Sequence, residues 1–377
     1  MKIVHIASIA LSEETGMGRI ACNWRKAFEK NGHEFIHVGN QECGKPLHHI
    51  LWGKQAANYL KDNGIKPDLI LVHEPASGYF FDFNVPVVLF SHGIEQRGWK
   101  VEAQFNYRVQ TFKSLFLPVY FRYRANAIGL KKANKLLLSN SEDVAYAISQ
   151  FNRKAKDVII FKNGYYKENV PSKNTPPQYN PVTFLFNASW LARKGKTDMI
   201  AAFSELHKEY PNQWKLILAG VGNNEAAIRA EFPSVLQSNI DIVPFFTQAE
   251  ETALYEKSDV FLLPSYFEGQ SLALTQAMAS GLCCVCSDNC GQHDFIKHQD
   301  NGLLFKTGDA TELAKQLKTL LLHTDLIKKY AKNAKKMVEN YTWEKVGNEV
   351  VEICEQLVGQ SKAGHHKANL SLQTDNA

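Results

Sequence analysis

The sequence lacks the features that would place a chain across a membrane or outside the cell. Its 377 residues contain no apolar run of the roughly 18 residues that a transmembrane helix needs. The apolar start at 2–7 is too short for a signal peptide and leads into the polar segment 12–14, so we interpret it as a first buried strand. The net charge of +5 is mild, and no recognised RNA-binding module is present. We therefore expect a cytoplasmic protein with no nucleic-acid partner.

Disulfides are not expected, because the seven cysteines are odd in number and lack a secretory context. Four of them lie close together, at Cys283, Cys284, Cys286 and Cys290. No recognised zinc spacing is matched, and successive residues of a strand point to opposite faces. We interpret 282–287 as a buried strand in which cysteine serves as a small hydrophobic residue.

Short apolar runs alternate with helix-like stretches along most of the chain, which is typical of mostly parallel sheets covered by helices on both faces. The predicted strands are 2–7, 34–38, 69–73, 87–91, 135–139 and 158–161 in the first half, then 183–187, 214–219, 240–244, 260–264 and 282–287. The sequence thus predicts an α/β protein of two successive domains with a cleft between them.

The domain boundaries follow from composition. The proline-rich stretch 170–181 is expected to be a linker, because it sustains neither a helix nor a central strand. It separates a first domain at 1–169 from a second at 182–342. The amphipathic stretch 343–358 is predicted as a final helix, and the polar tail 359–377 is expected to be disordered.

The segment 264–281 combines a strand end, a glycine turn and a helix that stops at a second glycine. In an open α/β sheet, ligands bind at the carboxyl ends of the strands. The free N–H groups of a helix beginning near Ser271 suit a diphosphate. Glu268 can accept hydrogen bonds from sugar hydroxyls, and Gln276 could reach a ribose. The alternative is an acidic turn followed by a helix that only packs.

This segment resembles the signature helix of retaining glycosyltransferase family 4, the group 1 glycosyltransferases. The family pattern is Glu, seven residues, then Glu, followed by Ala-Met-Ala and glycine; here the two positions hold Glu268 and Gln276. The resemblance implies the GT-B fold, with two Rossmann-like doubly wound domains facing across a cleft. It implies that Glu268 contacts the donor sugar and Gln276 the ribose, where glutamine lacks the charge of the usual glutamate. The implied donor-binding residues of this segment are Gly269, Gln270, Ser271, Leu272 and Gln276.

The loop 186–195 resembles the family's Gly-Arg-…-Lys-Gly loop, whose basic residues hold the leaving diphosphate. Lys194 matches the lysine, Ser189 stands where an arginine is usual, and Arg193 supplies a second charge. Cations beside a helix N-terminus would stabilise charge as the sugar–phosphate bond breaks. The alternative for this loop alone is a solvated basic turn.

In the first domain, Gly16 and Gly18 resemble the family's glycine loop, which lines the cleft and lets ligands approach the backbone. Together with Ala21 they also match a dinucleotide fingerprint, but they lie too far from the preceding strand for that motif. His92 ends a predicted strand and is followed by glycine, which resembles the active-site histidine near the donor sugar.

Three further matches complete the resemblance. Gly220 lies in an Ala-Gly-x-Gly turn below the nucleotide, and Phe245 falls near the place where the base is held. Trp343 resembles the aromatic that opens the closing helix, which in this family returns to the first domain. The implied reaction transfers a sugar from a nucleotide-diphosphate donor, UDP or GDP, to a hydroxyl acceptor with retention of anomeric configuration. Surface polysaccharide, lipopolysaccharide or glycolipid assembly is the implied setting.

No Asp-x-Asp pair occurs in the chain. Metal-dependent glycosyltransferases of the other main fold use such a pair to hold a cation on the diphosphate. Arg193, Lys194 and the helix dipole would replace that cation, so we expect no obligatory metal and no cofactor. No dedicated nucleophile is required by a mechanism in which the leaving diphosphate stays on the attacked face.

The stretch 97–135 holds nine basic residues, one acid and eight interleaved aromatic residues. Such a stretch can lie on an anionic membrane surface near a lipid-linked acceptor, which would make the protein peripheral on the inner face of the membrane. The alternative is a solvated basic face with a buried aromatic side.

Three rival functions stay open at this point. An NAD-dependent oxidoreductase rests on the weak match at Gly16–Ala21 alone. A nucleotide-sugar epimerase of the same fold would interconvert sugars without an acceptor. A binding protein with little turnover is suggested by Gln276 and Ser189. The sequence does not distinguish the donor sugar, the base or the acceptor.

Overall fold

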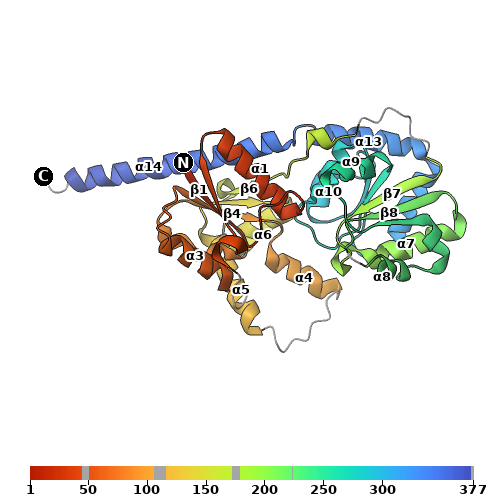
Figure 1. Cartoon of the computed structure of the whole chain (residues 1–377), viewed down its shortest axis with the longest axis horizontal. Helices are drawn as coiled ribbons and strands as arrows, with labels where there is room; N and C mark the ends of the chain where they lie inside the picture. The colour runs from red at the N-terminus through yellow and green to blue at the C-terminus, as the bar shows by residue number, and fades with distance from the viewer. Residues whose placement is uncertain (45–50, 106–115, 172–178, 223, 375–377) are drawn as a thin grey trace. The chain divides into compact units, whose positions relative to one another are not determined.

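The computed structural model describes residues 1–44, 51–105, 116–171, 179–222 and 224–374 of the chain (Figure 1). Contacts within the chain divide it into two compact units. Unit 1 comprises Met1–Gln96, Gln110–Lys162 and Trp343–Ala377, and unit 2 comprises Arg97–Val109 and Asn163–Thr342. Each unit has its own sheet.

Unit 1 is built on a six-stranded sheet in which every neighbouring pair is parallel, in the order β2-β1-β3-β4-β5-β6. Its strands are β1 Lys2–Ile6, β2 Glu34–Val38, β3 Leu69–His73, β4 Val87–Ser91, β5 Lys135–Leu138 and β6 Val158–Ile160. Its helices are α1 Gly16–Lys30, α2 Asn40–Cys43, α3 Trp52–Asp62, α5 Phe116–Lys132, α6 Ser141–Phe151 and α14 Trp343–Thr374, and α4 Glu95–Phe105 runs on from it into unit 2.

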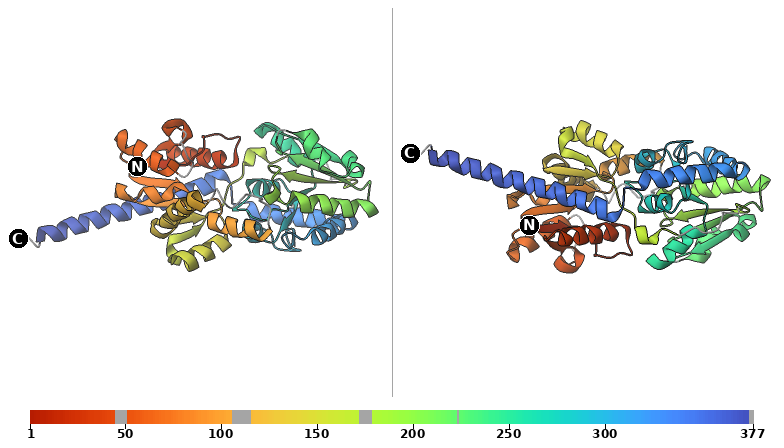
Figure 2. Two further views of the ribbon diagram at one scale, coloured as in Figure 1. Left: turned by 90° about the horizontal axis from the view of Figure 1, so that it is seen from below. Right: turned by 90° about the horizontal axis from the view of Figure 1, so that it is seen from above.

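The two faces of this sheet bury different side chains. One face packs Val4, Ile6, Val72 and Leu89 into an aliphatic core with Trp52 of α3. The opposite face carries alternate residues of the same strands and is covered by α1 and α14, which lie side by side (Figure 2). Because neighbouring strand residues point to opposite faces, an almost continuous apolar run is what a strand covered on both sides requires.

Unit 2 repeats the plan with a second parallel sheet, in the order β12-β11-β10-β7-β8-β9. Its strands are β7 Val182–Asn187, β8 Trp214–Ala219, β9 Ile240–Val243, β10 Val260–Leu263, β11 Cys283–Ser287 and β12 Leu303–Phe305. Its helices are α7 Lys196–Glu209, α8 Glu225–Ala230, α9 Gln248–Glu256, α10 Leu272–Ala279, α11 Cys290–Phe295, α12 Ala310–Leu322 and α13 Thr324–Val338.

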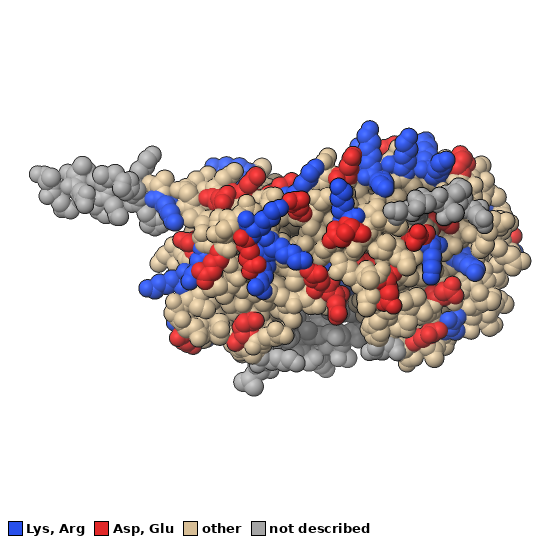
Figure 3. Space-filling view, turned by 45° about the horizontal axis from the view of Figure 1, so that its top comes forward, with Lys and Arg blue, Asp and Glu red and all other residues tan. Residues whose placement is uncertain are grey.

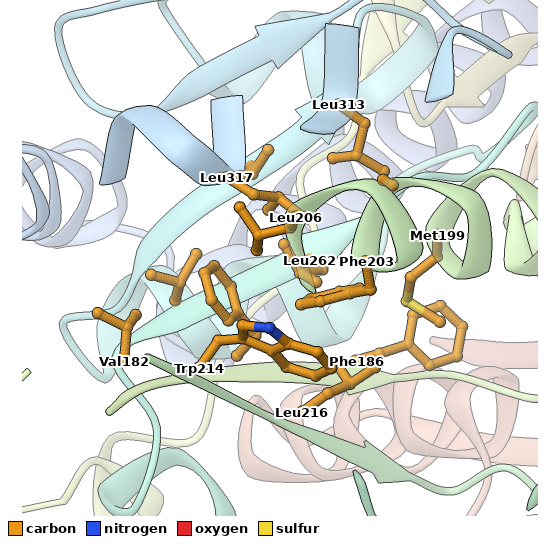
Figure 4. Packing of buried hydrophobic residues seen from close by; sticks show 14 of the residues in the cluster. Val182, Phe186, Met199, Phe203, Leu206, Trp214, Leu216, Leu262, Leu313 and Leu317 are labelled. Atoms are coloured by element: carbon orange, nitrogen blue, oxygen red, sulfur yellow. The ribbon is translucent and has the colours of Figure 1, made fainter. Parts of the chain in front are cut away.

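The core of unit 2 is aromatic where α7 lies on the sheet (Figure 4). Phe203 of α7 packs against Trp214 of β8, with ring centroids 4.7 Å apart, and against Phe184 of β7. Leu317 of α12 adds an aliphatic layer to the same cluster. Large rings of this kind contribute most of the apolar area that a domain buries.

The cysteine-rich strand is buried, as the sequence predicts. Within β11, Cys283 belongs to the core cluster on one face, and Cys284 and Cys286 belong to the cluster on the other. All seven cysteines are free. Burial raises the pKa of the Cys284 thiol well above its usual value, with smaller contributions from Cys286 and Cys283, so these thiols are inert small hydrophobic groups.

The structure differs from the sequence-based expectation at the start of unit 2, at one edge strand of its sheet and at the carboxyl end of the chain. Unit 2 already begins at Asn163, whereas the expected linker spans 170–181, of which 172–178 lie outside the described residues. The short strand β12 was not predicted. Helix α14 continues to Thr374 through the tail that was expected to be disordered, and the alanine, lysine and leucine content of 359–374 is compatible with a helix.

Positive charge gathers on one helix of unit 2. The buried face of α13 includes Ile327, Tyr330 and Ala334. Its exposed face carries five lysines: Lys328, Lys329, Lys332, Lys335 and Lys336. Figure 3 shows basic side chains projecting from the upper right, where Figure 1 places α13. Within the described ranges, no helix is long and apolar enough to cross a bilayer.

Candidate functional site

The candidate site lies at the point where the strand order of unit 2 reverses. From β7 the chain runs outward through β8 and β9, then returns to the other side of β7 to form β10, β11 and β12. The carboxyl ends of β7 and β10 therefore diverge into a crevice, which is where open α/β sheets bind their ligands. The two segments that the sequence analysis selected follow these two strands.

The loop after β7 places two cations beside the acidic turn after β10. Lys194 ends the single 3-10 turn Ala192–Lys194, and its Nζ hydrogen-bonds Oε1 of Glu268. Arg193 lies farther out, with its guanidinium 4.0 Å from the same oxygen. The side chains of Lys194 and Glu268 are only 12% and 11% exposed, so this pair is largely shielded from solvent.

The electrostatics of this pair follow from its burial. Removal from water alone would raise the pKa of Glu268, but the charges of Lys194 and Arg193 and hydrogen bonds from Lys194 and Ser265 outweigh it. The pKa of Glu268 is therefore held below its usual value, and the carboxylate is ionised at neutral pH. Its contacts run through Oε1, including one from Ser265 Oγ at 3.0 Å. Among the described residues no hydrogen bond reaches Oε2, which can accept one from a ligand.

Backbone packing locks the two loops together. Gly195 has a φ of +74°, and a Cβ there would lie 1.9 Å from the carbonyl oxygen of Pro264. No other residue fits this position, because both the conformation and the space exclude a side chain. The N–H of Tyr266 also donates to the carbonyl of Arg193 at 2.9 Å. The relative position of the cations and the acidic turn is thus fixed by the main chain.

The neighbouring strand β11 supports the acidic turn, which the sequence analysis did not foresee. Ser287 Oγ donates to the Ser265 carbonyl at 2.5 Å, and Asn289 Nδ2 donates to the Ser265 and Tyr266 carbonyls at 3.0 and 3.2 Å. Ser287 is the last residue of β11 and Asn289 follows it, beside β10 in the sheet. The sequence signal that could have predicted this support is the polar residue at the end of the predicted strand 282–287.

Helix α10 begins directly after the acidic turn. Ser271 is its N-cap, and its Oγ accepts from the N–H of Leu274 at 3.3 Å. The N–H groups of Leu272 and Ala273 precede the first bonds within the helix, and no acidic residue stands in the first turn. These amides, four and five residues after Glu268, and the positive end of the helix dipole form a region suited to an anion.

Two glutamines of this segment hold the start of unit 2 rather than open space. Gln270 Oε1 accepts from the N–H of Asn163 at 2.7 Å, and its amide donates to Thr275 Oγ1 at 3.1 Å. Gln276 Oε1 accepts from the N–H of Tyr166 at 3.1 Å, and its amide lies 3.4 Å from the Asn169 carbonyl. A ribose contact by Gln276 would require an exchange of these bonds. Gly269, beside them, is closely approached by Gly291, where a Cβ would lie 2.2 Å from the Gly269 carbonyl oxygen.

The remaining predicted residues of unit 2 line the ends of β7, β8 and β9. The carbonyl of Ser189 accepts from the N–H of Leu191 at 2.8 Å, which shapes the turn after β7. Gly220 follows β8 with a φ of +66°, and a Cβ there would lie 3.1 Å from the ring of Phe246. Phe245 follows β9 and is 66% exposed, so its ring is accessible to a ligand.

In unit 1 the glycine loop opens α1. Gly16 is the first residue of the helix, and Thr15 caps it by accepting from the N–H of Gly18 at 3.2 Å. A Cβ on Gly18 would lie 2.2 Å from the Ser12 carbonyl oxygen, so the close approach that requires this glycine is one within the chain. The loop between Ile6 and Gly16 is longer than a dinucleotide fingerprint allows.

His92 follows the carboxyl end of β4 and is half-buried. Burial lowers the pKa of His92 to about 4, so its ring is neutral at physiological pH. Its Nε2 lies 3.3 Å from Nδ1 of His73, the last residue of β3. Across the described residues of the chain, no group of three or more histidine, cysteine, aspartate or glutamate side chains is placed to hold a metal ion.

Only part of the stretch 97–135 can be compared with its predicted membrane role, because 106–115 lie outside the described residues. Arg97 lies over the ring of Phe267 and is 3.6 Å from the Cys290 sulfur. Arg122 pairs with Glu95 at 2.5 Å, and Lys135 pairs with Asp157 at 3.1 Å. Several of the described cations are therefore engaged within the protein.

Comparison with known proteins shows which family the region around this site resembles. Residues 168–337 match the family model of glycosyl transferases group 1. The matched region contains the loop after β7, the acidic turn and α10. The chain spans about half the length of the curated relatives that it matches first, at 49%, 54% and 46%.

One such relative comes from Campylobacter jejuni and is 29% identical over 189 residues, 49% of this chain and 47% of the relative. Its name is GalNAc-alpha-(1->4)-GalNAc-alpha-(1->3)-diNAcBac-PP-undecaprenol alpha-1,4-N-acetyl-D-galactosaminyltransferase.

Two solved structures share the fold over nearly the whole chain. Sucrose-phosphate synthase of Thermosynechococcus elongatus has a TM-score of 0.76 at 17% identity, covering 96% of this chain and 100% of that one. HepE of Anabaena, solved in complex with UDP-glucose, has a TM-score of 0.69 at 16% identity, covering 95% and 100%. These likenesses confirm the GT-B fold, and residues 168–337 are similar to the group 1 glycosyl transferases. None of these matches supports the epimerase alternative.

Proposed function

We propose that this protein is a retaining glycosyltransferase that takes a sugar from a nucleotide-diphosphate donor and transfers it to a hydroxyl acceptor. The observation that carries the proposal is the pairing of Lys194 with Glu268 at the strand-order reversal of unit 2, directly before the N-terminus of α10. Cations and free amides at one crevice suit a diphosphate whose charge grows as it leaves. The family match of this same region supports the assignment.

Each group has a role in the proposed reaction. Lys194 Nζ and the first amides of α10 hold the diphosphate, and Arg193 adds charge from the rim. Glu268 keeps Lys194 in place through Oε1 and offers Oε2 to a hydroxyl of the donor sugar. When the sugar–phosphate bond breaks, its electrons pass to the diphosphate oxygen. The acceptor hydroxyl attacks the sugar carbon from the side of that leaving group and gives its proton to the diphosphate. The fixed loops need no rearrangement as charge develops, which is how preorganised groups accelerate a reaction.

The donor is proposed to carry a UDP or GDP moiety. A uridine nucleotide is favoured, because HepE, which shares the fold, was solved with UDP-glucose. The exposed ring of Phe245 lies at the end of β9, where it can cover a base. Metal assistance is not part of the proposal, since Lys194, Arg193 and the helix terminus supply the positive charge.

The acceptor is proposed to be a hydroxyl of a lipid-linked saccharide, in the assembly of a surface polysaccharide or glycolipid. The name of the Campylobacter relative gives a saccharide on PP-undecaprenol, which supports this class. The enzyme would then work in the cytoplasm at the inner face of a membrane. The lysine face of α13 is the better surface for that contact, since three cations of the 97–135 stretch are engaged within the protein.

The membrane part is tested by sedimentation with vesicles of phosphatidylglycerol and, as a control, phosphatidylcholine. Reversal of Lys332, Lys335 and Lys336 to glutamate should abolish binding to anionic vesicles. The same reversal of Lys131 and Lys132, which lie at the end of α5, should have a smaller effect. Binding that does not depend on lipid charge would contradict the membrane contact.

The transferase part is tested by thermal shift with a panel of UDP-, GDP- and ADP-sugars, because a ligand that binds the folded state alone raises the melting temperature. We expect one nucleotide to stabilise the protein, and release of that nucleoside diphosphate when a lipid-linked acceptor is added. Stabilisation without turnover would favour a binding protein, and sugar interconversion without an acceptor would favour an epimerase. A response to NAD alone would favour the oxidoreductase.

A further inference from the structure

Four histidines of unit 1 form a continuous chain of hydrogen bonds that ends at His92. His92 Nε2 lies 3.3 Å from His73 Nδ1, and His73 Nε2 lies 3.0 Å from His5 Nε2. His5 Nδ1 lies 2.9 Å from His37 Nδ1, and His37 Nε2 lies 3.0 Å from the carbonyl oxygen of Ile9. We call these four residues the histidine chain.

Strand register brings these side chains together. His5 of β1 and His37 of β2 are directly opposite each other in the parallel ladder. His5 is also opposite Leu71 of β3, so His73, two residues farther on, points to the same face of the sheet. His92 follows β4, the next strand in the sheet. The chain thus crosses four adjacent strands.

Aromatic side chains enclose the inner members and keep water away. Trp24 of α1 meets the rings of His5 and His73 edge-on, with centroids 5.9 and 5.7 Å apart. Phe35 stacks on His5 at 5.4 Å. His5 is fully buried and His73 is 4% exposed. Burial is the main cause that lowers the pKa of all four rings, and at His37 it outweighs the opposing hydrogen bond to Ile9 and the charge of Glu42, so the four imidazoles are neutral at physiological pH.

A neutral imidazole has one N–H donor and one acceptor nitrogen, which gives the chain a direction. The carbonyl of Ile9 can only accept, so the proton of His37 is on Nε2 and its Nδ1 is an acceptor. His5 must then donate from Nδ1, which leaves its Nε2 as an acceptor for the Nε2–H of His73. His73 in turn accepts through Nδ1 from the Nε2–H of His92. The proton of His92 is thereby placed on Nε2, and its Nδ1 keeps a lone pair.

We propose that His73, His5 and His37 are positioning residues that fix the tautomer of His92, so that its Nδ1 serves only as an acceptor for a substrate hydroxyl. The role of His92 Nδ1 as an acceptor for a substrate hydroxyl rests on the proposed transferase reaction. The positions of the four protons do not depend on that reaction. Among the described residues no partner is found for His92 Nδ1, which leaves this lone pair to a ligand.

The placement of the protons is read directly from ¹⁵N-histidine-labelled protein, ligand-free and at neutral pH, by long-range ¹H–¹⁵N correlation spectra. We expect the Nε2–H tautomer at His37, His73 and His92 and the Nδ1–H tautomer at His5 alone. His298, whose Nδ1 accepts from the N–H of Leu304 at 3.0 Å, is an independent Nε2–H reference. A wild-type spectrum in which His5 is protonated on Nε2, or His92 on Nδ1, would overturn the proposal without any variant.

Two substitutions of His37 test whether the direction of its hydrogen bonds fixes the position of the proton on His92. In His37→Gln the amide can donate to Ile9 and accept from His5, so the direction is kept. In His37→Arg the guanidinium has donors only, so His5 must accept through Nδ1, and every proton along the chain reverses. We expect His92 to carry its proton on Nε2 in the first variant and on Nδ1 in the second. An identical His92 tautomer in both folded variants would contradict transmission.

The activity arm separates this inference from the proposed function. We expect kcat/KM for the donor to fall about tenfold in His37→Arg, the effect of one lost hydrogen bond, and to change little in His37→Gln. Equal activity of the two variants with a reversed tautomer would overturn the role of His92 Nδ1. If the wild type transfers no sugar, the proposed function fails, whereas the NMR pattern still decides the proton positions.

Discussion

The two units use the same sheet plan but place opposite kinds of chemistry at their strand-order reversals. In unit 2 the ends of β7 and β10 carry an ion pair, Lys194 with Glu268. In unit 1 the reversal falls between β1 and β3, and these strands carry the neutral rings of His5 and His73. One edge stabilises formal charge, whereas the other offers directed hydrogen bonds without charge.

The pKa values of two carboxyl groups, one in each unit, shift in opposite directions. Glu268 has two cations beside it, and its pKa is lowered despite burial. Glu74 follows β3, and no cation is among the causes of its pKa shift. Burial raises the pKa of Glu74 to about 8. The charges of Glu95 and Asp143 reinforce this effect, and a hydrogen bond from Ser91 at 2.5 Å opposes it. The same residue type is thus ionised in one unit and mostly protonated in the other at neutral pH. In the proposed reaction the first environment holds the diphosphate and the sugar hydroxyl that Glu268 Oε2 accepts, and the second holds the substrate hydroxyl that His92 Nδ1 accepts.

The largest expected effect comes from removing the cation of the pair. Lys194→Met keeps most of the side-chain volume but deletes the charge, and we expect turnover to fall at least 10²-fold, as loss of one preorganised charge contact does. Initial rates with a saturating donor measure this. Lys196→Met is the matched control, because Lys196 pairs with Glu231 at the surface and its loss should change turnover little.

The same variant leaves Glu268 buried without its partner, so stability must be followed as well. We expect Lys194→Met to lower the melting temperature and the double variant Lys194→Met, Glu268→Gln to recover it, while turnover stays low. Turnover restored in the double variant would mean that Lys194 acts only as a counter-ion of Glu268. Unchanged turnover in Lys194→Met would remove Lys194 from the site.

The next prediction concerns a carboxylate that a mutation introduces into unit 2, away from Lys194 and Arg193. Gln276→Glu restores the family pattern but replaces an amide that faces the carbonyls of Tyr166 and Asn169. We expect the free energy of unfolding in urea to fall by about 1–3 kcal/mol, with no gain in nucleotide affinity. Gln316→Glu on α12 is the control for an added charge at another buried glutamine. Tighter nucleotide binding at unchanged stability would show that position 276 contacts the ribose.

The last prediction tests the neutral state of Glu74. Because its folded pKa of about 8 lies above the ordinary 4.5, the folded state holds a proton that the unfolded state has lost. Its contribution to stability is therefore full below pH 4.5 and declines toward pH 8, by at most about 1.4 kcal/mol per pH unit. Glu74→Gln should gain stability relative to wild type over this interval. Urea unfolding at several pH values measures the difference, and a constant difference would place an ionised Glu74 in the folded state.

The fold was largely predictable because buried parallel strands appear in the sequence as short apolar runs. Leu69–His73 and Val87–Ser91 were predicted with the bounds that the structure gives. Strand β12, Leu303–Phe305, was missed, although β6, Val158–Ile160, is equally short and was predicted. The helix that continues through 359–374 was missed because polar composition does not exclude a helix.

The candidate site was predictable only where its parts follow their strands directly. Lys194 and Glu268 were placed by motifs, in the loops that follow β7 and β10. The support from Ser287 and Asn289 and the bonds of Gln276 to Tyr166 depend on which segments become neighbours in space, which one sequence does not state. The histidine chain has the same cause: His5 and His37 become partners only through the register of β1 with β2.

A crystal structure of the protein with UDP, and in parallel with GDP, tests whether Lys194 and the start of α10 hold the diphosphate. We expect the β-phosphate to lie within hydrogen-bond distance of Lys194 Nζ and of the amides of Leu272 or Ala273 at the start of α10. A diphosphate bound elsewhere in the molecule, with Lys194 and those amides untouched, would contradict it.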